Sequence, residues 1–230
     1  MRINKYLAQA GLGSRRKVEQ YILDGKIKVN NEVVTNLATQ IDRDKDVVEY
    51  DNKLIESEQY KYFMLNKPKG LECTMKKSPD SFTMADFIEQ NPALKNCTYV
   101  GRLDKESEGL LLLSNDGRIV EKLTNPKYQK PKRYVVTVDI PFSEAHIEDL
   151  ERGMIINGYR TRKAEVTKLT NRKFSIVLTE GKNRQIRQMC HKVDLRVHRL
   201  IRTEFDKFSI GELKAGEYQE LPSQLFDEYI

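Results

Sequence analysis

Residues 101–117 read GRLDKESEGLLLLSNDG, and this stretch decides what the larger part of the chain must be. It begins as a polar loop that includes Gly101 and Gly109 and carries the carboxylate of Asp104. The loop continues into four leucines, a run typical of a buried strand or helix segment. The sequence therefore predicts a carboxylate on a loop that is anchored by the hydrophobic core.

The composition is that of a basic chain without a membrane segment. The 230 residues include 40 Lys and Arg against 34 Asp and Glu, a net charge of +6 that favours an anionic partner without identifying it. No apolar run approaches the ~20 residues of a membrane-spanning helix, and no signal peptide follows Met1. Cys73, Cys97 and Cys190 form no Cys-x-x-Cys pair, which argues against a zinc site or a disulfide framework. We expect a cytoplasmic protein.

Residues 1–55 are predicted to form a small domain. Two short helices end at Gly11 and Gly25, and a strand hairpin and a further strand follow. Residues 2–28 hold 7 basic and 2 acidic residues, whereas 29–55 hold 3 basic and 6 acidic ones. Clustered positive charge on a helix pair attracts phosphate groups, although an ordinary solvated helix face has the same composition.

Residues 52–60 are polar and aperiodic, which predicts a linker, and residues 61–230 are predicted to form one α+β domain. Irregular alternation of strands and helices favours a mixed, largely antiparallel sheet. Strands are predicted at 62–65, 110–113, 134–138, 164–169 and 174–178, and helices at 84–90, 117–123, 143–152 and 185–193.

Three segments resemble the active-site motifs of RNA pseudouridine synthases of the RsuA, RluB and RluF branch. They are GRLD with the following Ser-x-Gly-Leu at 101–110, KRYVVTV at 132–138 and EGKNRQIRQM at 180–189. Residues 183–187 are most similar to RluF. Residues 1–50 also resemble the αL RNA-binding motif of small-subunit ribosomal proteins and some tRNA synthetases, so the implied fold is an αL module followed by a pseudouridine-synthase-type domain.

The resemblance implies a role for each of five residues. Asp104 is the expected catalytic aspartate, and Arg102 is expected to enter the space that a flipped nucleotide leaves. Tyr134 would stack on the target uracil and Ile186 would pack against both. Arg187 would pair with the carboxylate of Asp104. From residue types alone, the aspartate is equally a turn residue and the tyrosine an ordinary core residue.

RNA-backbone contacts are expected from two basic surfaces. The surface of the N-terminal helices comprises Arg2, Lys5, Arg15, Arg16 and Lys17. The second lies in the basic stretch 182–202 and includes Lys182 and Arg184, and Gln188 stands where the family often has a further basic residue. The implied partner is large-subunit ribosomal RNA, with tRNA as a second candidate, and we expect a monomer.

The expected reaction breaks the bond between ribose C1′ and uracil N1 and rejoins the uracil through C5. It needs no redox change and no group donor, and the chain lacks the common nucleotide, metal and acyl-transfer motifs, so we expect no cofactor and no metal. Two alternatives stay open. One is a noncatalytic RNA-binding or ribosome-assembly factor, and the other is a glycoside hydrolase with Glu106 or Glu108 as its second carboxylate.

Overall fold

The computed structural model describes residues 1–43, 45–55 and 59–230, and contacts within the chain divide it into two compact units. One comprises Met1–Lys61 with Asn115–Gly117, and the other comprises Tyr62–Ser114 with Arg118–Ile230. Each unit has its own buried apolar cluster. No helix among the described residues is long and apolar enough to cross a membrane.

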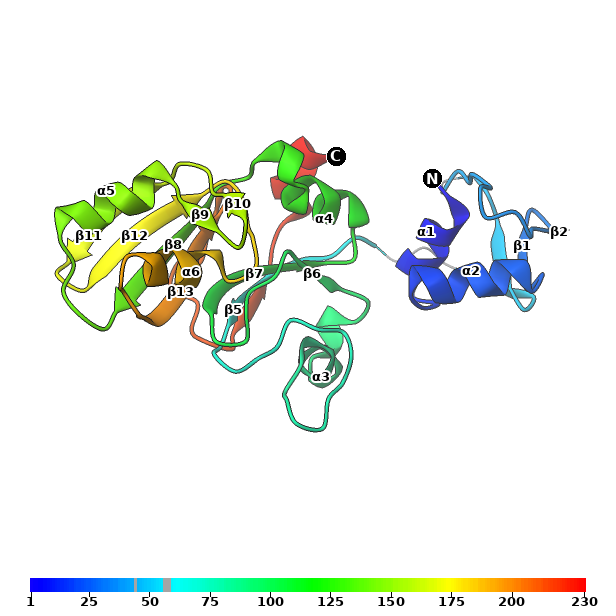
Figure 1. Cartoon of the computed structure of the whole chain (residues 1–230). Helices are drawn as coiled ribbons and strands as arrows, with labels where there is room; N and C mark the ends of the chain where they lie inside the picture. Colours follow the sequence, from blue (N-terminus) through cyan, green and yellow to red (C-terminus); the bar gives the residue numbers. More distant parts are fainter. Residues whose placement is uncertain (44, 56–58) are drawn as a thin grey trace. The chain divides into compact units, whose positions relative to one another are not determined.

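The N-terminal unit contains two helices and a small antiparallel sheet (Figure 1). Its elements are α1 (Ile3–Gln9), α2 (Arg15–Leu23), β1 (Ile27–Val29), β2 (Glu32–Val33), β3 (Val48–Tyr50) and β4 (Lys53–Leu54), with strand order β2-β1-β3-β4. The Ser14 hydroxyl accepts the Lys17 N–H at 3.3 Å and caps α2. Asn30 and Asn31 both have positive φ, as the tightest hairpin turns require. The predicted helices and hairpin are thus confirmed.

The expected linker at 52–60 is wrong at its start, because β4 pairs with β3 there. Residues 56–58 of that segment lie outside the described residues.

The second unit is built on a sheet with the strand order β11-β12-β8-β13-β7-β5-β15, and β14 and β6 pair with β13 and β7. Its strands are β5 (Tyr62–Lys67), β6 (Thr98–Val100), β7 (Glu108–Ser114), β8 (Lys132–Val138), β11 (Glu165–Thr170), β12 (Lys173–Leu178), β13 (Val197–Phe205), β14 (Phe208–Ser209) and β15 (Tyr218–Glu220). Among these strands β13 and β7 are parallel, and the other pairs are antiparallel. The predicted mixed, largely antiparallel sheet is confirmed.

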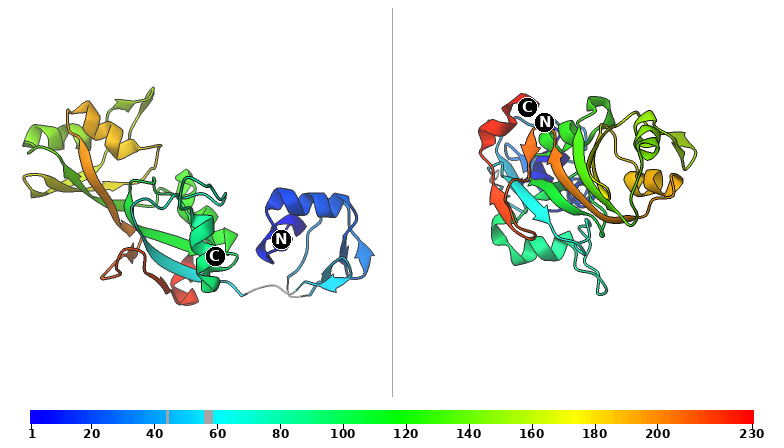
Figure 2. Two further views of the ribbon diagram at one scale, coloured as in Figure 1. Left: turned by 90° about the horizontal axis from the view of Figure 1, so that it is seen from below. Right: turned by 90° about the vertical axis from the view of Figure 1, so that its left-hand side faces the viewer.

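Helical elements lie on both faces of this sheet. The remaining elements are α3 (Met84–Gln90), α4 (Gly117–Thr124), α5 (Glu144–Arg152), α6 (Gln185–Lys192), the 3₁₀ helices η1 (Pro92–Leu94), η2 (Pro126–Tyr128) and η3 (Ser223–Tyr229), and a short hairpin of β9 (Ile155–Ile156) and β10 (Tyr159–Arg160). Phe63 of β5 packs with Phe87 of α3, and the adjacent Tyr62, on the opposite face, stacks on Phe226 of η3. Helices α5 and α6 lie over β11, β12, β8 and β13 (Figures 1 and 2). Leu150 of α5 and Met189 of α6 join Val136 of β8 in the core.

The central strand β13 is absent from the elements that the sequence predicts. Its sequence VHRLIRTEF contains four charged or imidazole side chains, so it shows no continuous apolar run. It nevertheless lies between β8 and β7. This strand carries one edge of the candidate site.

Candidate active site

Asp104 lies on the loop between β6 and β7, called here the Asp104 loop (residues 101–107). Gly101 opens the loop with φ of 73°, a conformation that favours glycine. The Asp104 carbonyl accepts the Ser107 N–H at 3.0 Å and closes a turn. Leu103 is buried beside Asp104, whose own side chain is partly exposed. The four leucines that follow the loop are buried in β7, so the predicted anchoring of the loop by the core is confirmed.

Lys67, at the end of β5, bonds to backbone carbonyls of this loop. Its side chain is fully buried, and its ammonium donates to the carbonyls of Pro68 at 3.0 Å and Ser107 at 2.8 Å, with a longer contact of 3.4 Å to Lys105. Burial lowers the pKa of Lys67. The Gly70 N–H adds a bond to the Lys105 carbonyl at 2.8 Å. The sequence Lys-Pro-Lys-Gly at 67–70 is also that of an ordinary turn, so it gives no signal for these contacts to the loop.

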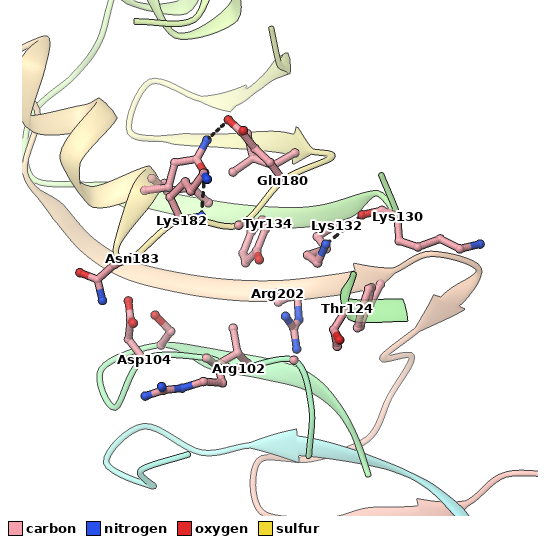
Figure 3. A pocket seen from close by; sticks show the side chains of 18 of the residues that line it. Arg102, Asp104, Thr124, Lys130, Lys132, Tyr134, Glu180, Lys182, Asn183 and Arg202 are labelled. Atoms are coloured by element: carbon pink, nitrogen blue, oxygen red, sulfur yellow. Dashed lines mark hydrogen bonds between the residues drawn. The ribbon is translucent and has the colours of Figure 1, made fainter. Parts of the chain in front are cut away.

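A cavity of about 420 Å³ opens above the Asp104 loop (Figure 3). Arg102 and Asp104 line it from the loop, Tyr134 lines it from β8 and Ile186 from the start of α6. The cavity thus brings together four of the five residues expected at the active site. In Figure 3, Tyr134 points into the cavity from the side opposite Asp104.

The expected ion pair between Arg187 and Asp104 is absent, because no contact within 4 Å joins them in the part of the chain described. Arg187 instead donates to two backbone carbonyls, those of Glu106 and Val197, each at 3.3 Å. Burial, and next the positive charge of Arg184, lower the pKa of Arg187, whereas the negative charges of Asp104 and Glu106 raise it. Arg187 therefore links the Asp104 loop to β13 through these two backbone contacts.

The rim of the cavity includes two basic residues from the loop that precedes α6. Lys182 and Arg184 are exposed and line the cavity. Glu180, which is half-buried, also lines it. The Glu180 carboxylate is held by the side-chain amide of Gln185 at 2.8 Å and by the Arg162 N–H at 2.9 Å. These contacts fix the loop that carries the two cations.

The expected cationic surface over 182–202 needs a correction. Arg202 is 1% exposed, so it belongs to the cavity wall and the core, and Arg199 forms a bidentate ion pair with Glu108 at 2.9 and 2.7 Å. Lys182, Arg184, Lys192 and Arg196 are the members of that stretch that are exposed and make no ion pair among the described residues. Sequence spacing did not signal that a charged residue in this stretch would be buried.

In the N-terminal unit, the expected RNA contacts lie on or beside the two helices. Arg2 precedes α1 and Lys5 lies within it, and Arg15, Arg16 and Lys17 form the first turn of α2. Arg2 and the three α2 residues are exposed. None of the five makes an ion pair with an acidic residue that the structure describes, so their charge is available to an external anion.

Comparison with known proteins gives consistent matches along the chain. The family model for RNA pseudouridylate synthase matches residues 61–192, and the S4 domain model matches residues 1–48. Within residues 1–43, 45–55 and 59–230, no group of three His, Cys, Asp or Glu side chains is arranged to hold a metal ion.

Two relatives show how far the similarity extends. The ribosomal large subunit pseudouridine synthase B of Bacillus subtilis (strain 168) is 36% identical over 227 residues, covering 96% of this chain and 91% of the relative. The dual-specificity RNA pseudouridine synthase RluF of Escherichia coli (strain K12) is 35% identical over 224 residues, covering 96% of this chain and 75% of the relative.

A solved structure, a crystal structure of pseudouridylate synthase, has a TM-score of 0.71 and 27% identity and covers 100% of both chains. The resemblance stated from the motifs is confirmed by these matches, as is the N-terminal RNA-binding module, which the S4 domain model identifies. The chain therefore belongs to the RNA pseudouridylate synthase family.

Proposed function

We propose that this enzyme converts uridine to pseudouridine in structured RNA with Asp104 as its catalytic carboxylate. One observation carries the assignment: Asp104 lines the same cavity as Tyr134 and Ile186, each from a different element. In such a cavity the carboxylate can act on the ribose. The aromatic ring and the aliphatic side chain can contact the base. Pure RNA binding would gain nothing from the negative charge.

In the proposed reaction, the N1–C1′ bond breaks and its electron pair leaves with the uracil. The base turns and C5 forms a new bond to C1′. C5 then loses its hydrogen as a proton, and N1 gains a proton. The Asp104 carboxylate either attacks C1′ or removes a ribose proton, and either route balances without a cofactor. Tyr134 stacks on the base, which contributes about 1–3 kcal/mol.

Extrusion of the target nucleotide needs a residue to occupy the vacated space, because unstacking costs a few kcal/mol. Arg102 lies two residues before Asp104 and is exposed at the cavity. Its guanidinium also suits a phosphate contact. We assign it this wedge role, with Arg187 holding the loop rather than the reacting group.

For the substrate, we propose large-subunit ribosomal RNA, with transfer RNA as a second candidate. The B. subtilis relative is named for the large subunit and the E. coli relative for dual specificity. Residues 1–55 would attach to the RNA backbone and residues 61–230 would carry out the chemistry. We propose that the enzyme acts as a cytoplasmic monomer.

Asp104→Asn tests the assignment. RNA labelled with tritium at uridine C5 releases the label when pseudouridine forms, because C5 then bonds to ribose. The variant should bind RNA with unchanged affinity and release no tritium. Glu106→Gln is the matched control, since this neighbouring carboxylate is exposed and pairs with Lys69 at 3.4 Å. Tritium release by Asp104→Asn would overturn the assignment, and loss of activity in Glu106→Gln would favour a two-carboxylate mechanism.

A further inference from the structure

Two cations flank Tyr134 on the cavity side of the sheet. Lys132 precedes Tyr134 by two residues on β8, so both side chains lie on the same face. Arg202 on β13 is the register partner of Tyr134, and directly paired residues also share a face. All three line the cavity, and Figure 3 shows Lys132 and Arg202 beside Tyr134. Lys132 and Arg202 are called here the cationic wall.

The Arg202 guanidinium is held in place but incompletely bonded. Its Nε donates to the Leu110 carbonyl at 2.8 Å, and its guanidinium carbon lies 5.0 Å from the centre of the Phe205 ring. Its Nη2 is buried without a hydrogen-bond partner. A buried donor without a partner is costly, so native structures rarely retain one unless a ligand or water completes it.

Lys132 also lacks an acidic partner among the described residues. Its ammonium donates to the Lys130 carbonyl at 2.9 Å and lies 4.9 Å from the centre of the Phe205 ring. The nearby carboxylate of Asp206 bonds instead to the Lys130 ammonium at 2.9 Å and to the Tyr229 hydroxyl. The wall therefore presents two partly desolvated positive charges that no carboxylate of the described residues neutralises through an ion pair.

The proposed reaction produces an anion at this position. When the N1–C1′ bond breaks, the departing uracil carries the electron pair, and the charge spreads over N1, O2 and O4. A base that stacks on Tyr134 would present its edge to residues that flank the ring on the same face. A backbone phosphate is a weaker fit, because Arg202 is 1% exposed and lies in the wall of the cavity rather than on its rim.

We propose that Lys132 and Arg202 stabilise the uracil anion during cleavage of the glycosidic bond. This inference rests on the proposed function and adds two residues to it. Positive charge fixed where negative charge develops lowers the barrier, because it requires no reorganisation at the moment of reaction. No other reagent is needed, since the electron pair that leaves with uracil returns in the C5–C1′ bond.

The lowered pKa of Lys132 predicts that activity falls at alkaline pH. The pKa of Lys132 is lowered to about 8, mainly by burial and then by the charge of Arg202, against the opposing effect of Asp206. Lys132 therefore loses its charge as the pH rises through about 8, and kcat/KM, which reports on the free enzyme, should fall there. The other charged groups that line the cavity are Arg102, Asp104, Lys130, Glu180, Lys182 and Arg184.

The test compares Lys132→Met and Lys132→Arg with the wild type in single-turnover reactions on 5-tritiated RNA, with binding measured separately. Lys132→Met should lower the rate constant on the order of 100-fold and leave Kd within threefold. Lys132→Arg should retain most of the rate and lose the alkaline fall, because a guanidinium stays charged. Lys95→Met, an exposed lysine of the same unit, controls for net charge.

A second substrate separates anion stabilisation from a structural defect. Fluorine at C5 makes the departing base less basic, so RNA with 5-fluorouridine at the target should show a smaller penalty from Lys132→Met. Its reaction is followed by loss of the fluorinated nucleoside after nuclease digestion. Equal penalties on both substrates, or a loss in Kd with an unchanged rate constant, would overturn the inference, the latter indicating a phosphate contact.

The same assay distinguishes whether the proposed role of the cationic wall or the proposed function itself is wrong. Tritium release by the wild type and none by Asp104→Asn would establish the reaction in the same assay. A Lys132→Met rate within twofold of the wild type would then count against the cationic wall alone.

Discussion

Gly109 lies where the Asp104 loop becomes β7, next to Arg202 on the parallel strand β13. Its φ is 106°, and a Cβ atom there would lie 2.2 Å from the Arg202 carbonyl oxygen. The glycine is therefore required both for its backbone conformation and for the close approach of two strands. This contact places the end of the Asp104 loop next to Arg202 of the cationic wall.

Gly109→Ala should therefore destabilise the fold by at least about 2 kcal/mol, combining backbone strain with displacement of β13. Chemical denaturation followed by circular dichroism would measure the loss. Gly181→Ala is the matched control, since a Cβ there meets no atom within 4 Å. A Gly109→Ala protein as stable as the wild type would show that the strands do not approach as closely as described.

Strands with alternating or continuous apolar residues could be predicted from the sequence. Strand β13, which lies between β8 and β7, could not. The alternation of Tyr134, Val136 and Val138 predicts β8, and the leucine run predicts β7. Strand β13 was missed because charged residues interrupt its apolar pattern. Arg202 was expected at the surface for the same reason, since neither register nor burial of a charged side chain is encoded by local periodicity.

The candidate site shows the same division. Motifs identified Arg102, Asp104, Tyr134 and Ile186, which line one cavity. They did not reveal that Arg187 bonds to the carbonyls of Glu106 and Val197 rather than to a carboxylate, because side-chain direction depends on how α6 packs on the sheet. The buried Lys67 was missed because a Lys-Pro-Lys-Gly segment is also an ordinary turn.

Helix α2 provides a prediction about RNA attachment. Arg15→Gln combined with Arg16→Gln removes two exposed charges from its first turn. RNA affinity should weaken, and the slope of log K against log salt should become shallower by about 1–2. Lys45→Gln combined with Lys53→Gln is the matched control on the acidic side of the same unit. Equal effects of the two pairs, measured by filter binding across salt concentrations, would argue against an α2 contact.

At the scale of the whole molecule, the chain combines an S4 domain with a pseudouridine synthase domain. Exposed cations lie in the first turn of α2 and at the cavity rim, so each unit offers positive charge to RNA beyond what the net charge of +6 conveys. We therefore expect attachment and chemistry to depend on different residues. Substitutions at α2 should change binding, whereas substitutions in the cavity should change the rate.

The most direct test of the central claim is a map of pseudouridines in ribosomal and transfer RNA from cells that lack this protein. One or a few pseudouridines should disappear, with large-subunit ribosomal RNA as the expected source, and the wild-type gene should restore them whereas the gene for Asp104→Asn should not. An unchanged map, or restoration by Asp104→Asn, would contradict this claim.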